Sequence, residues 1–160
     1  MEENPLVDRP DPSEQKQGHN IRKTVLFLCT HNSARSQMAE GILNTEFPSK
    51  YIVFSAGTYP SSVNPYALQV MTEIGIDISS YMSKSLEEFL DETIDFVVTV
   101  CDTAKENCPF FPGAKTNIHK DFEDPSSLAD FRRVRDQIRT WIINQFTEFP
   151  RQHEIKSPTL

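Results

Sequence analysis

The sequence predicts a single α/β domain of three layers, in which a central four-stranded parallel sheet is flanked by helices on both faces. Short apolar runs rich in strand-forming residues alternate along the chain with longer segments whose apolar residues recur at helical spacing. This alternation is typical of parallel strands joined by right-handed crossovers. A chain of 160 residues is long enough for one well-packed core and too short for two domains that each have a core of their own.

The single domain is expected to cover residues 23–150. Residues 1–22 combine three prolines and many charges with no periodic apolar pattern, so we expect a disordered extension there. The tail over residues 151–160 is expected to be loose. The expected elements are strands at 25–28, 51–54, 95–100 and 116–119, helices at 37–47, 65–74 and 131–146, and a short helix at 86–90.

The helix boundaries follow from local signals. Pro48 ends the first helix, because proline cannot continue the backbone hydrogen bonds. Asn64 is a good N-cap and Pro65 a good first residue for the second helix, which is expected to stop at Gly75. The last helix is amphipathic over about four turns and is expected to end before Pro150.

Composition argues against several classes of function. The net charge is -7 and the 16 basic residues show no dominant cluster, which argues against nucleic acid or an anionic membrane as a partner. The run 132–135, Arg-Arg-Val-Arg, is interrupted and is expected to be a solvated helix face. No apolar run approaches the ~18 residues of a membrane span, and no secretory signal is recognisable. The three cysteines are therefore expected to be thiols in a reducing cytoplasm.

The residues after the first strand predict a nucleophile inside an anion-binding loop. Cys29 follows the apolar run directly, and a helix begins after Arg35 and Ser36. Inward-pointing N–H groups of residues 30–35 and the positive end of that helix would favour a thiolate at Cys29. Arg35 adds a planar fork of donors that suits a tetrahedral oxyanion. A lone cysteine after a strand is usually a small buried residue, but the Arg-Ser at this spacing favours the nucleophile.

Two further candidate residues are expected at the same edge of the sheet. Cys101 follows the third strand and Asp124 follows the fourth, and the carboxyl ends of parallel strands share one edge. If residues 101–108 are helical, the Cα atoms of Cys101 and Cys108 lie about 10 Å apart, whereas a disulfide needs less than about 7 Å. A disulfide between them would therefore require this turn to unwind. Asp124 could protonate a leaving oxygen, or it could serve only as a cap for the last helix.

These residues together resemble a known family. The match begins with the anion loop of the low-molecular-weight tyrosine phosphatase superfamily, and it covers residues 24–148. The pair Cys101 and Cys108 is the signature of its thioredoxin-coupled arsenate reductase branch, whereas the phosphatases usually carry aromatic residues after Asp-Pro, where this chain has 126–127 as Ser-Ser. The matching segments are Cys29 to Gly41, Ser55-Ala56-Gly57, Val63-Asn64-Pro65, Cys101, Cys108-Pro109 and Asp124-Pro125.

The resemblance implies a phosphatase-like fold and a three-cysteine relay that reduces arsenate to arsenite. Cys29 would attack arsenate, Arg35 would hold its oxygens, and Asp124 would protonate the leaving hydroxyl. Cys101 would then attack Cys29 as arsenite leaves, and Cys108 would attack Cys101 and carry the disulfide outward. Thioredoxin or glutaredoxin would reduce this disulfide, and no cofactor is implied. The implied oxyanion-binding residues are Thr30, His31, Asn32, Ser33, Ala34, Arg35 and Ser36.

Residues that support the loop are implied in the same way. Ser36 is expected to hydrogen-bond the Cys29 thiolate, and Asn32 to brace the loop. Glu40 matches a position that helps to bind potassium beside the loop in some relatives, but Lys84 replaces an acidic residue of that site. We therefore expect the Lys84 ammonium to lie near Glu40, with no bound metal.

His31 occupies a position often held by glycine, and its side chain is not expected to be catalytic.

Two other functions stay open. Cys29, Arg35 and Asp124 alone would suffice for a phosphatase acting on phosphotyrosine or small phosphate esters, and weak phosphatase activity could accompany arsenate reduction. A binding module that responds to oxyanions or to redox state through residues 101–108 is the third reading. The protein is expected to be a monomer.

Overall fold

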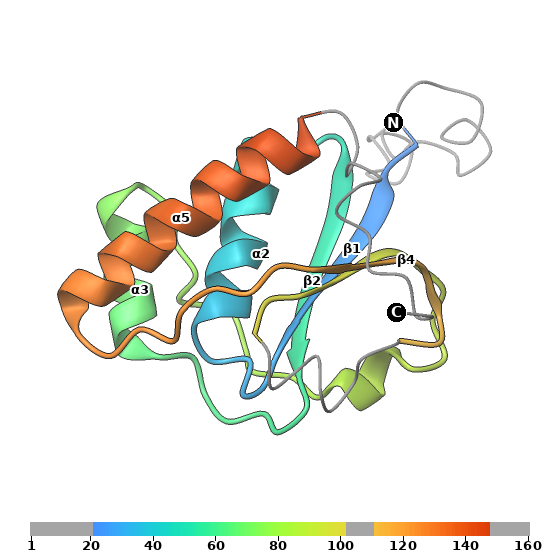
Figure 1. Cartoon of the computed structure of the whole chain (residues 1–160), viewed down its shortest axis with the longest axis horizontal. Coiled ribbons are helices and arrows are strands. Elements are labelled where there is room, and N and C mark those ends of the chain that lie inside the picture. The colour runs from blue at the N-terminus through green and yellow to red at the C-terminus, as the bar shows by residue number, and fades with distance from the viewer. Residues whose placement is uncertain (1–20, 102–110, 148–160) are drawn as a thin grey trace, which may run out of the picture.

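The sheet has four parallel strands, as the sequence predicts, and their order is β2-β1-β3-β4 (Figure 1). The computed structural model describes residues 21–101 and 111–147. The elements in chain order are β1 (Lys23–Cys29), α2 (Arg35–Glu46), β2 (Tyr51–Gly57), α3 (Pro65–Glu73), the 3-10 helix η2 (Leu86–Phe89), β3 (Ile94–Thr99), β4 (Ala114–His119) and α5 (Leu128–Phe146).

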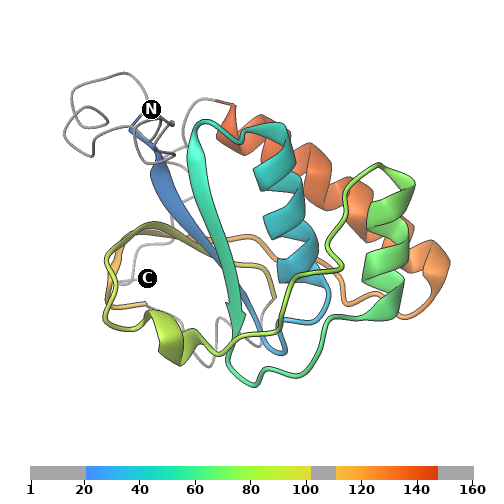
Figure 2. The same ribbon diagram turned by 180° about the vertical axis from the view of Figure 1, so that it is seen from behind.

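β1 is a central strand and is buried on both faces. Val25 and Phe27 belong to the core on one side of the sheet, whereas Leu26 and Leu28 belong to the core on the other side. This explains why β1 reads as a continuous apolar run instead of an alternating one. α2, α3 and α5 cover the first face, and η2 covers the second together with Phe111 (Figures 1 and 2). The predicted three-layer fold class is confirmed.

Several element boundaries differ from the predictions, and those of β2, β4 and α5 are described here. β2 continues through the segment 55–57, which the sequence suggested as the end of the strand. β4 begins at Ala114, two residues before its predicted start. α5 begins at Leu128, because the Ser127 hydroxyl caps the helix by accepting a hydrogen bond from the Asp130 N–H at 3.1 Å.

The predicted start and end of α3 are confirmed. The Asn64 side chain accepts a hydrogen bond from the Tyr66 N–H at 2.8 Å, and Pro65 is the first helical residue. Gly75 has φ +81° just after the helix, a conformation that glycine adopts at helix ends. Asn64 thus fixes the start of α3 at the carboxyl edge of the sheet, where the candidate site lies.

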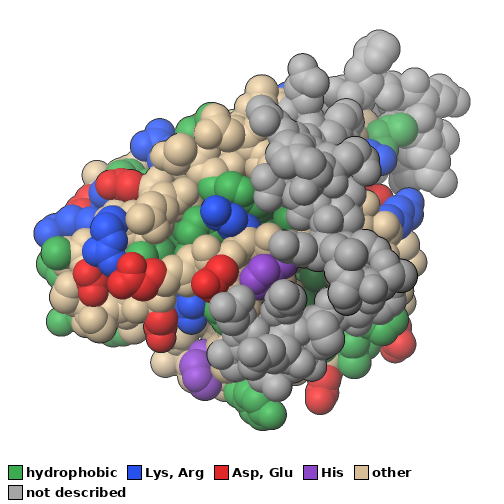
Figure 3. Space-filling view, viewed as in Figure 1, with side chains coloured by type: hydrophobic (Ala, Val, Ile, Leu, Met, Phe, Trp, Pro, Cys, Tyr) green, Lys and Arg blue, Asp and Glu red, His purple; other side chains and the backbone are tan. Residues whose placement is uncertain are grey.

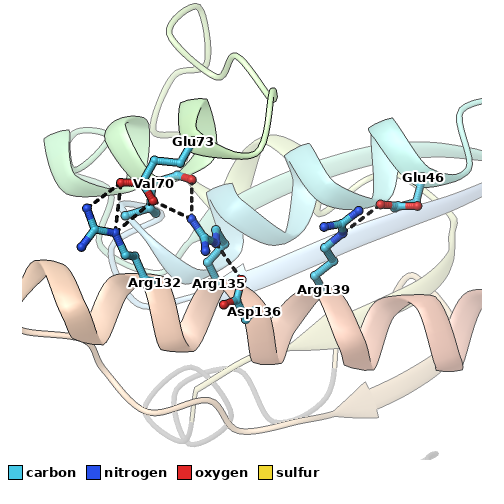
Figure 4. Close-up of polar contacts among 7 residues, drawn as sticks. All are labelled: Glu46, Val70, Glu73, Arg132, Arg135, Asp136 and Arg139. Carbon is cyan, nitrogen blue, oxygen red and sulfur yellow. Dashed lines mark hydrogen bonds and ion pairs between the residues drawn. The ribbon is translucent and has the colours of Figure 1, made fainter.

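The prediction that residues 132–135 form a solvated face is wrong for Arg135, which is only 8% exposed. Its guanidinium donates hydrogen bonds to the carbonyl of Val70 at 2.9 Å and to the carboxylate of Glu73 at 2.8 Å (Figure 4). Val70 is in the last turn of α3, where carbonyl groups lack helical partners. Arg135 therefore caps α3 from α5, with its positive charge at the negative end of the helix dipole.

The other arginines of α5 are also paired with carboxylates. Two of these arginines tie α5 to α3 and α2. Figure 3 shows acidic and basic side chains intermingled over one end of the α5 face. The described part of this face therefore carries no concentrated basic surface. Arg132 pairs with Glu73 and Arg139 with Glu46 (Figure 4). Arg133 pairs with Glu123 and Asp130.

Three predictions fall on residues outside the described ranges. These are the loose tail at 151–160, the disordered extension at 1–22 except for Ile21 and Arg22, and the position of Cys108. Within the described ranges, each helix is too short or too polar to cross a membrane.

Candidate active site

The candidate site is the loop of residues 30–34, which joins the end of β1 to the start of α2 at the carboxyl edge of the sheet. Cys29 is the last residue of β1 and is 3% exposed. The Cys29 Sγ lies 2.9 Å from the Ser36 Oγ. Asn32 Nδ2 donates a hydrogen bond to the same Ser36 Oγ at 2.8 Å. Because the Ser36 oxygen accepts from Asn32, its own proton is available for the sulfur, and this chain of donors stabilises negative charge on Cys29.

Asn32 braces the loop from the inside. It is fully buried and has φ +49°, and among the described residues it is the one non-glycine residue with a positive φ. Its side-chain oxygen accepts hydrogen bonds from the Lys84 N–H at 2.8 Å and from Gln37 Nε2 at 2.9 Å. These contacts hold a backbone conformation that asparagine tolerates better than most residues. His31 needs no such conformation, so a side chain is accommodated there without backbone strain.

The loop is strapped from outside by residues 58–64. The carbonyl groups of Thr30, His31 and Ser33 accept hydrogen bonds from this segment. In a trans peptide the N–H points away from the carbonyl of the preceding residue, so the next N–H groups face the inside of the loop. This arrangement gives an anion-binding concavity of backbone donors. The bonds are Tyr59 N to Thr30 O (2.7 Å), Ser61 N to His31 O (3.1 Å) and Asn64 N to Ser33 O (2.9 Å).

Gly57 permits the close approach of β2 to the loop. A Cβ atom at this position would lie 2.6 Å from the carbonyl oxygen of Thr30 and 2.8 Å from the backbone nitrogen of Asn32. Both contacts are with backbone atoms, which cannot move aside without deforming the loop. In the sequence, Gly57 stands out only as part of the family match, because this contact joins segments far apart in the chain.

The loop opens into a pocket with a volume of about 290 Å³. Arg35 is 14% exposed at its side chain and donates a hydrogen bond to the Phe122 carbonyl at 2.9 Å. Its other terminal nitrogen lies 3.6 Å from the Asp124 carboxylate, which is 80% exposed. The lining residues are Cys29, His31, Ser33, Ala34, Arg35, Asn64, Asp124, Pro125 and Phe131.

Asp124 therefore lies beside the thiol and the guanidinium, in the linker between β4 and α5. The α5 cap is Ser127, so the alternative that Asp124 is only the helix cap is wrong. The geometry leaves the Asp124 carboxylate at the mouth of the pocket, where it can exchange a proton with a bound group or with solvent.

Cys101 lies next to the loop on the neighbouring strand. The register of β1 and β3 ends with Leu28 opposite Thr99, and Thr30 and Cys101 each follow two residues later. The Thr30 Oγ1 is 3.5 Å from the Cys101 Sγ. Cys101 is 3% exposed, and both described cysteines are free thiols. Cys29, which ends β1, and Cys101, which follows β3, therefore lie at one edge of the sheet, as the sequence predicts.

The carboxyl group of Glu40 lies behind the loop and is partly buried. Ser55 Oγ donates a hydrogen bond to the Glu40 carboxylate at 2.6 Å, and Lys84 Nζ donates to the Met82 carbonyl at 2.8 Å. Burial raises the pKa of the Glu40 carboxyl, and the hydrogen bond from Ser55 and the positive charge of Lys84 partly offset this rise. Within the described ranges, no cluster of three or more histidine, cysteine or acidic residues could hold a metal ion.

Gln37 is a second residue that the sequence analysis missed. It is fully buried, and its Nε2 lies within hydrogen-bond distance of the Asn32 carbonyl, the Asn32 side chain and the Met82 carbonyl. Gln37 thereby joins the loop to residues 82–84. The signal that could have found it is a glutamine on the inward face of a helix, directly after the Arg-Ser pair.

Comparison with known proteins places these features in a family. The profile of the family described as "Low molecular weight phosphotyrosine protein phosphatase" matches residues 24–155. "Arsenate reductase 2" of Staphylococcus epidermidis is 42% identical over 123 residues, which cover 76% of this chain and 94% of that protein.

Solved structures give the same result. "An arsenate reductase in the phosphate binding state" has a TM-score of 0.70 and 38% identity, covering 79% of this chain and 98% of the other. A thioredoxin-dependent arsenate reductase of Corynebacterium glutamicum has a TM-score of 0.63 and 27% identity, covering 84% of this chain and 67% of the other. From the fold, the loop and these matches together, the chain belongs to the low molecular weight phosphotyrosine protein phosphatase family.

Proposed function

We propose that this protein reduces arsenate to arsenite through a relay of Cys29, Cys101 and Cys108. The observation that carries the proposal is the contact of 3.5 Å between Cys101 Sγ and Thr30, the residue next to Cys29. A phosphatase of this fold needs one cysteine, whereas a reductase needs a second thiol that can reach the first. The similarity to arsenate reductases over most of both chains supports the same reaction.

The first step is attack of the Cys29 thiolate on arsenic. The backbone N–H groups of the loop and the Arg35 guanidinium hold the oxygens of arsenate. A sulfur–arsenic bond forms, one arsenic–oxygen bond breaks, and Asp124 supplies the proton with which the oxygen leaves as water. Ser36 stabilises the attacking thiolate through the 2.9 Å contact.

The second step reduces arsenic. The Cys101 thiolate attacks Cys29 Sγ, the sulfur–arsenic bond breaks, and its electron pair stays on arsenic, which passes from As(V) to As(III) and leaves as arsenite. The products are arsenite and a disulfide between Cys29 and Cys101. The Thr30 hydroxyl lies close enough to donate a hydrogen bond to the Cys101 sulfur and so to favour its thiolate.

The third step restores Cys29. Cys108 attacks Cys101 and leaves a disulfide between these two residues, which a thioredoxin-type protein dithiol reduces. This step rests on the sequence, because Cys108 lies outside the described ranges. The thioredoxin dependence of the similar Corynebacterium protein supports thioredoxin over glutaredoxin as the donor. A cytoplasmic location, where such donors are kept reduced, fits this chemistry.

A coupled assay tests the function and the donor together. NADPH consumption is followed with arsenate, using purified thioredoxin with its reductase in one arm and the glutaredoxin system with glutathione in the other. We expect arsenate-dependent turnover in the thioredoxin arm and none in either arm for Cys101→Ser. The proposal would be overturned if the wild-type protein showed no arsenate turnover in the thioredoxin arm and none in the glutaredoxin arm.

A phosphatase acting on aryl or small phosphate esters is the second candidate. Cys29, Arg35 and Asp124 line one pocket and would suffice for it. Cys101→Ser separates the two activities, because it removes arsenate reduction and leaves hydrolysis of p-nitrophenyl phosphate intact. If wild type shows neither activity, the remaining reading is a binding module that senses oxyanions or redox state.

A further inference from the structure

The linker between β4 and α5 holds the Arg35 side chain (Figure 1). Arg35 Nη1 donates a hydrogen bond to the Phe122 carbonyl at 2.9 Å, and the other terminal nitrogen lies 3.6 Å from the Asp124 carboxylate. A guanidinium is planar, so a hydrogen bond at one terminal nitrogen constrains the directions of its other N–H groups. The position of the Phe122 carbonyl therefore influences how the fork of Arg35 faces the pocket.

The main chain of the linker is anchored to β3 on the amino side of Phe122. The Phe122 N–H donates a hydrogen bond to the Val100 carbonyl at 3.1 Å, and the Lys120 N–H donates to the Thr99 carbonyl at 2.9 Å. The carbonyl that Arg35 uses belongs to the next peptide plane, which is joined to the anchored one through the two soft dihedrals of Phe122. The two backbone hydrogen bonds alone therefore do not fix the direction of this carbonyl.

The Phe122 ring supplies a second anchor. The residue is 4% exposed, and its ring packs edge to face against Trp141 of α5, with ring centroids 6.0 Å apart. Lys120 Nζ lies 5.8 Å from the centroid of the same ring. Trp141 packs edge to face on the fully buried Phe146, with ring centroids 5.8 Å apart. The indole thus connects the linker to the core.

Trp141 is only partly buried, because it borders a groove between the linker and α5. The groove has a volume of about 720 Å³, and residues 120–123 of the linker form one of its walls. The ion pair of Arg133 with Glu123 also joins the two walls, but both side chains are exposed, and such pairs contribute little. Without the indole, the open groove would leave the Phe122 ring room to shift.

We propose that Trp141 is a positioning residue for the oxyanion site. By packing on the Phe122 ring it fixes the Phe122 carbonyl, and this carbonyl orients the Arg35 guanidinium for the substrate. Trp141 is not among the residues that line the active-site pocket, so its effect on the oxyanion passes through Arg35. The inference rests on the proposed function for the identity of the substrate, whereas the positioning applies to any tetrahedral oxyanion in the loop.

Four variants separate the position of the ring from its contribution to stability. Trp141→Ala removes the ring, and Trp141→Phe keeps an aromatic ring against Phe122. Trp141→Leu keeps apolar bulk without a ring, and it replaces Trp141→Ala in every comparison if thermal melting shows that the alanine variant is unfolded. Phe54→Ala is the matched control. Phe54 is also half-buried and pairs with another ring, that of Phe89 at 5.3 Å, but it belongs to the core on the other face of the sheet.

The readout is protection of Cys29 by inorganic phosphate, a tetrahedral oxyanion that is not reduced. Alkylation of the Cys29 peptide by iodoacetamide is followed by mass spectrometry at increasing phosphate, and the rate without phosphate reports any change at the thiol itself. We expect protection to weaken about ten-fold in Trp141→Ala and about five-fold in Trp141→Leu. It should stay within about two-fold of wild type in Trp141→Phe and Phe54→Ala. KM for arsenate should follow the same order of variants.

A double-mutant cycle tests whether the effect passes through Arg35. Arg35→Lys keeps the charge but loses the planar fork. In that background, Trp141→Ala should weaken protection by no more than about two-fold. The role of Trp141 would be overturned by an equal loss in both backgrounds, by a loss in Phe54→Ala as large as that in Trp141→Ala, or by unchanged protection in Trp141→Ala. The expected pattern of protection in a protein without arsenate turnover would instead overturn the reductase proposal alone.

Discussion

The two ends of the sheet differ in how their polar groups are paired and in how favourable their backbone conformation is. At the amino end, Thr24 and Asp95 exchange hydrogen bonds from backbone and side chain at 2.8 to 3.1 Å, and Lys115 lies 3.4 Å from the carboxylate. At the carboxyl end, Asn32 has a positive φ and Gln37 Oε1 is buried without a hydrogen-bond partner in the described part of the chain. At the amino end, the polar groups that join β1 to β3 are paired with one another. The unfavourable backbone conformation and the unpaired polar atom both lie around the loop.

This difference indicates that the functional residues lie at the carboxyl end of the sheet. Residues held in sparsely populated conformations cost of order 1–3 kcal/mol each and persist only when the surrounding structure determines them. Here the aromatic side chains of Phe27, Tyr51 and Phe146 pack edge to face in the core, with ring centroids 5.3 to 6.3 Å apart. Substitutions at the carboxyl end should therefore affect chemistry first, and those at the amino end should affect stability alone.

The largest expected effect is that of Gly57→Ala. The added Cβ meets the backbone of Thr30 and Asn32 at 2.6 and 2.8 Å, so the loop must deform. We expect arsenate turnover to fall by about 100-fold or more and stability to fall by about 2 kcal/mol. Gly75→Ala is the matched control, because nothing lies within 4 Å of its Cβ and only its φ of +81° is strained. It should lose about 1 kcal/mol and keep its activity. Equal losses of turnover in both variants would contradict the role of Gly57.

Ser36→Ala should have the next largest effect. It breaks the chain of donors from Asn32 to the Cys29 sulfur. We expect the alkylation rate of Cys29 near pH 6.5 to fall about ten-fold, which corresponds to about 1.4 kcal/mol of thiolate stabilisation. Ser61→Ala is the control, since Ser61 contacts the loop through its backbone N–H. An alkylation rate unchanged in Ser36→Ala would show that the hydroxyl does not stabilise the thiolate.

Asp95→Asn probes the opposite end of the sheet. Burial alone would raise the pKa of Asp95, but the hydrogen bonds from Thr24 and the charge of Lys115 outweigh it and hold the pKa below its usual value. The depressed pKa contributes stability that is present above the unfolded value near pH 4 and is lost as the pH falls through the folded value. Urea unfolding should show a loss of about 1 kcal/mol at pH 7, which shrinks below pH 4, with kcat unchanged. A loss that stays constant down to pH 2 would contradict this account.

Lys84→Met should give the smallest effect. The Lys84 charge lowers the pKa of Glu40 against the effect of burial, and its removal should raise that pKa further. Because the Lys84 ammonium is exposed, we expect turnover to fall only about three-fold, with Lys84→Arg close to wild type. Wild-type rates should be equal in sodium and potassium buffers. Strong stimulation of wild type by potassium would refute the prediction that Lys84 takes the place of a metal ion.

The sequence was sufficient for features that depend on local signals or on topology. The Asn64-Pro65 start of α3 follows from capping preferences. The convergence of Cys29, Cys101 and Asp124 follows from the rule that parallel strands share a carboxyl edge. The roles of Gly57 and of the buried Arg135 could not be predicted, because they arise from contacts between segments that only the register and helix packing bring together.

The most direct test of the relay is a single turnover in the Cys108→Ser variant. The reduced variant is mixed with one equivalent of arsenate without any thiol donor, and its peptides are mapped by mass spectrometry under non-reducing conditions. The account predicts one arsenite per chain and a disulfide that joins Cys29 to Cys101. Release of no arsenite, or a Cys29 that remains a free thiol after arsenite has formed, would contradict it.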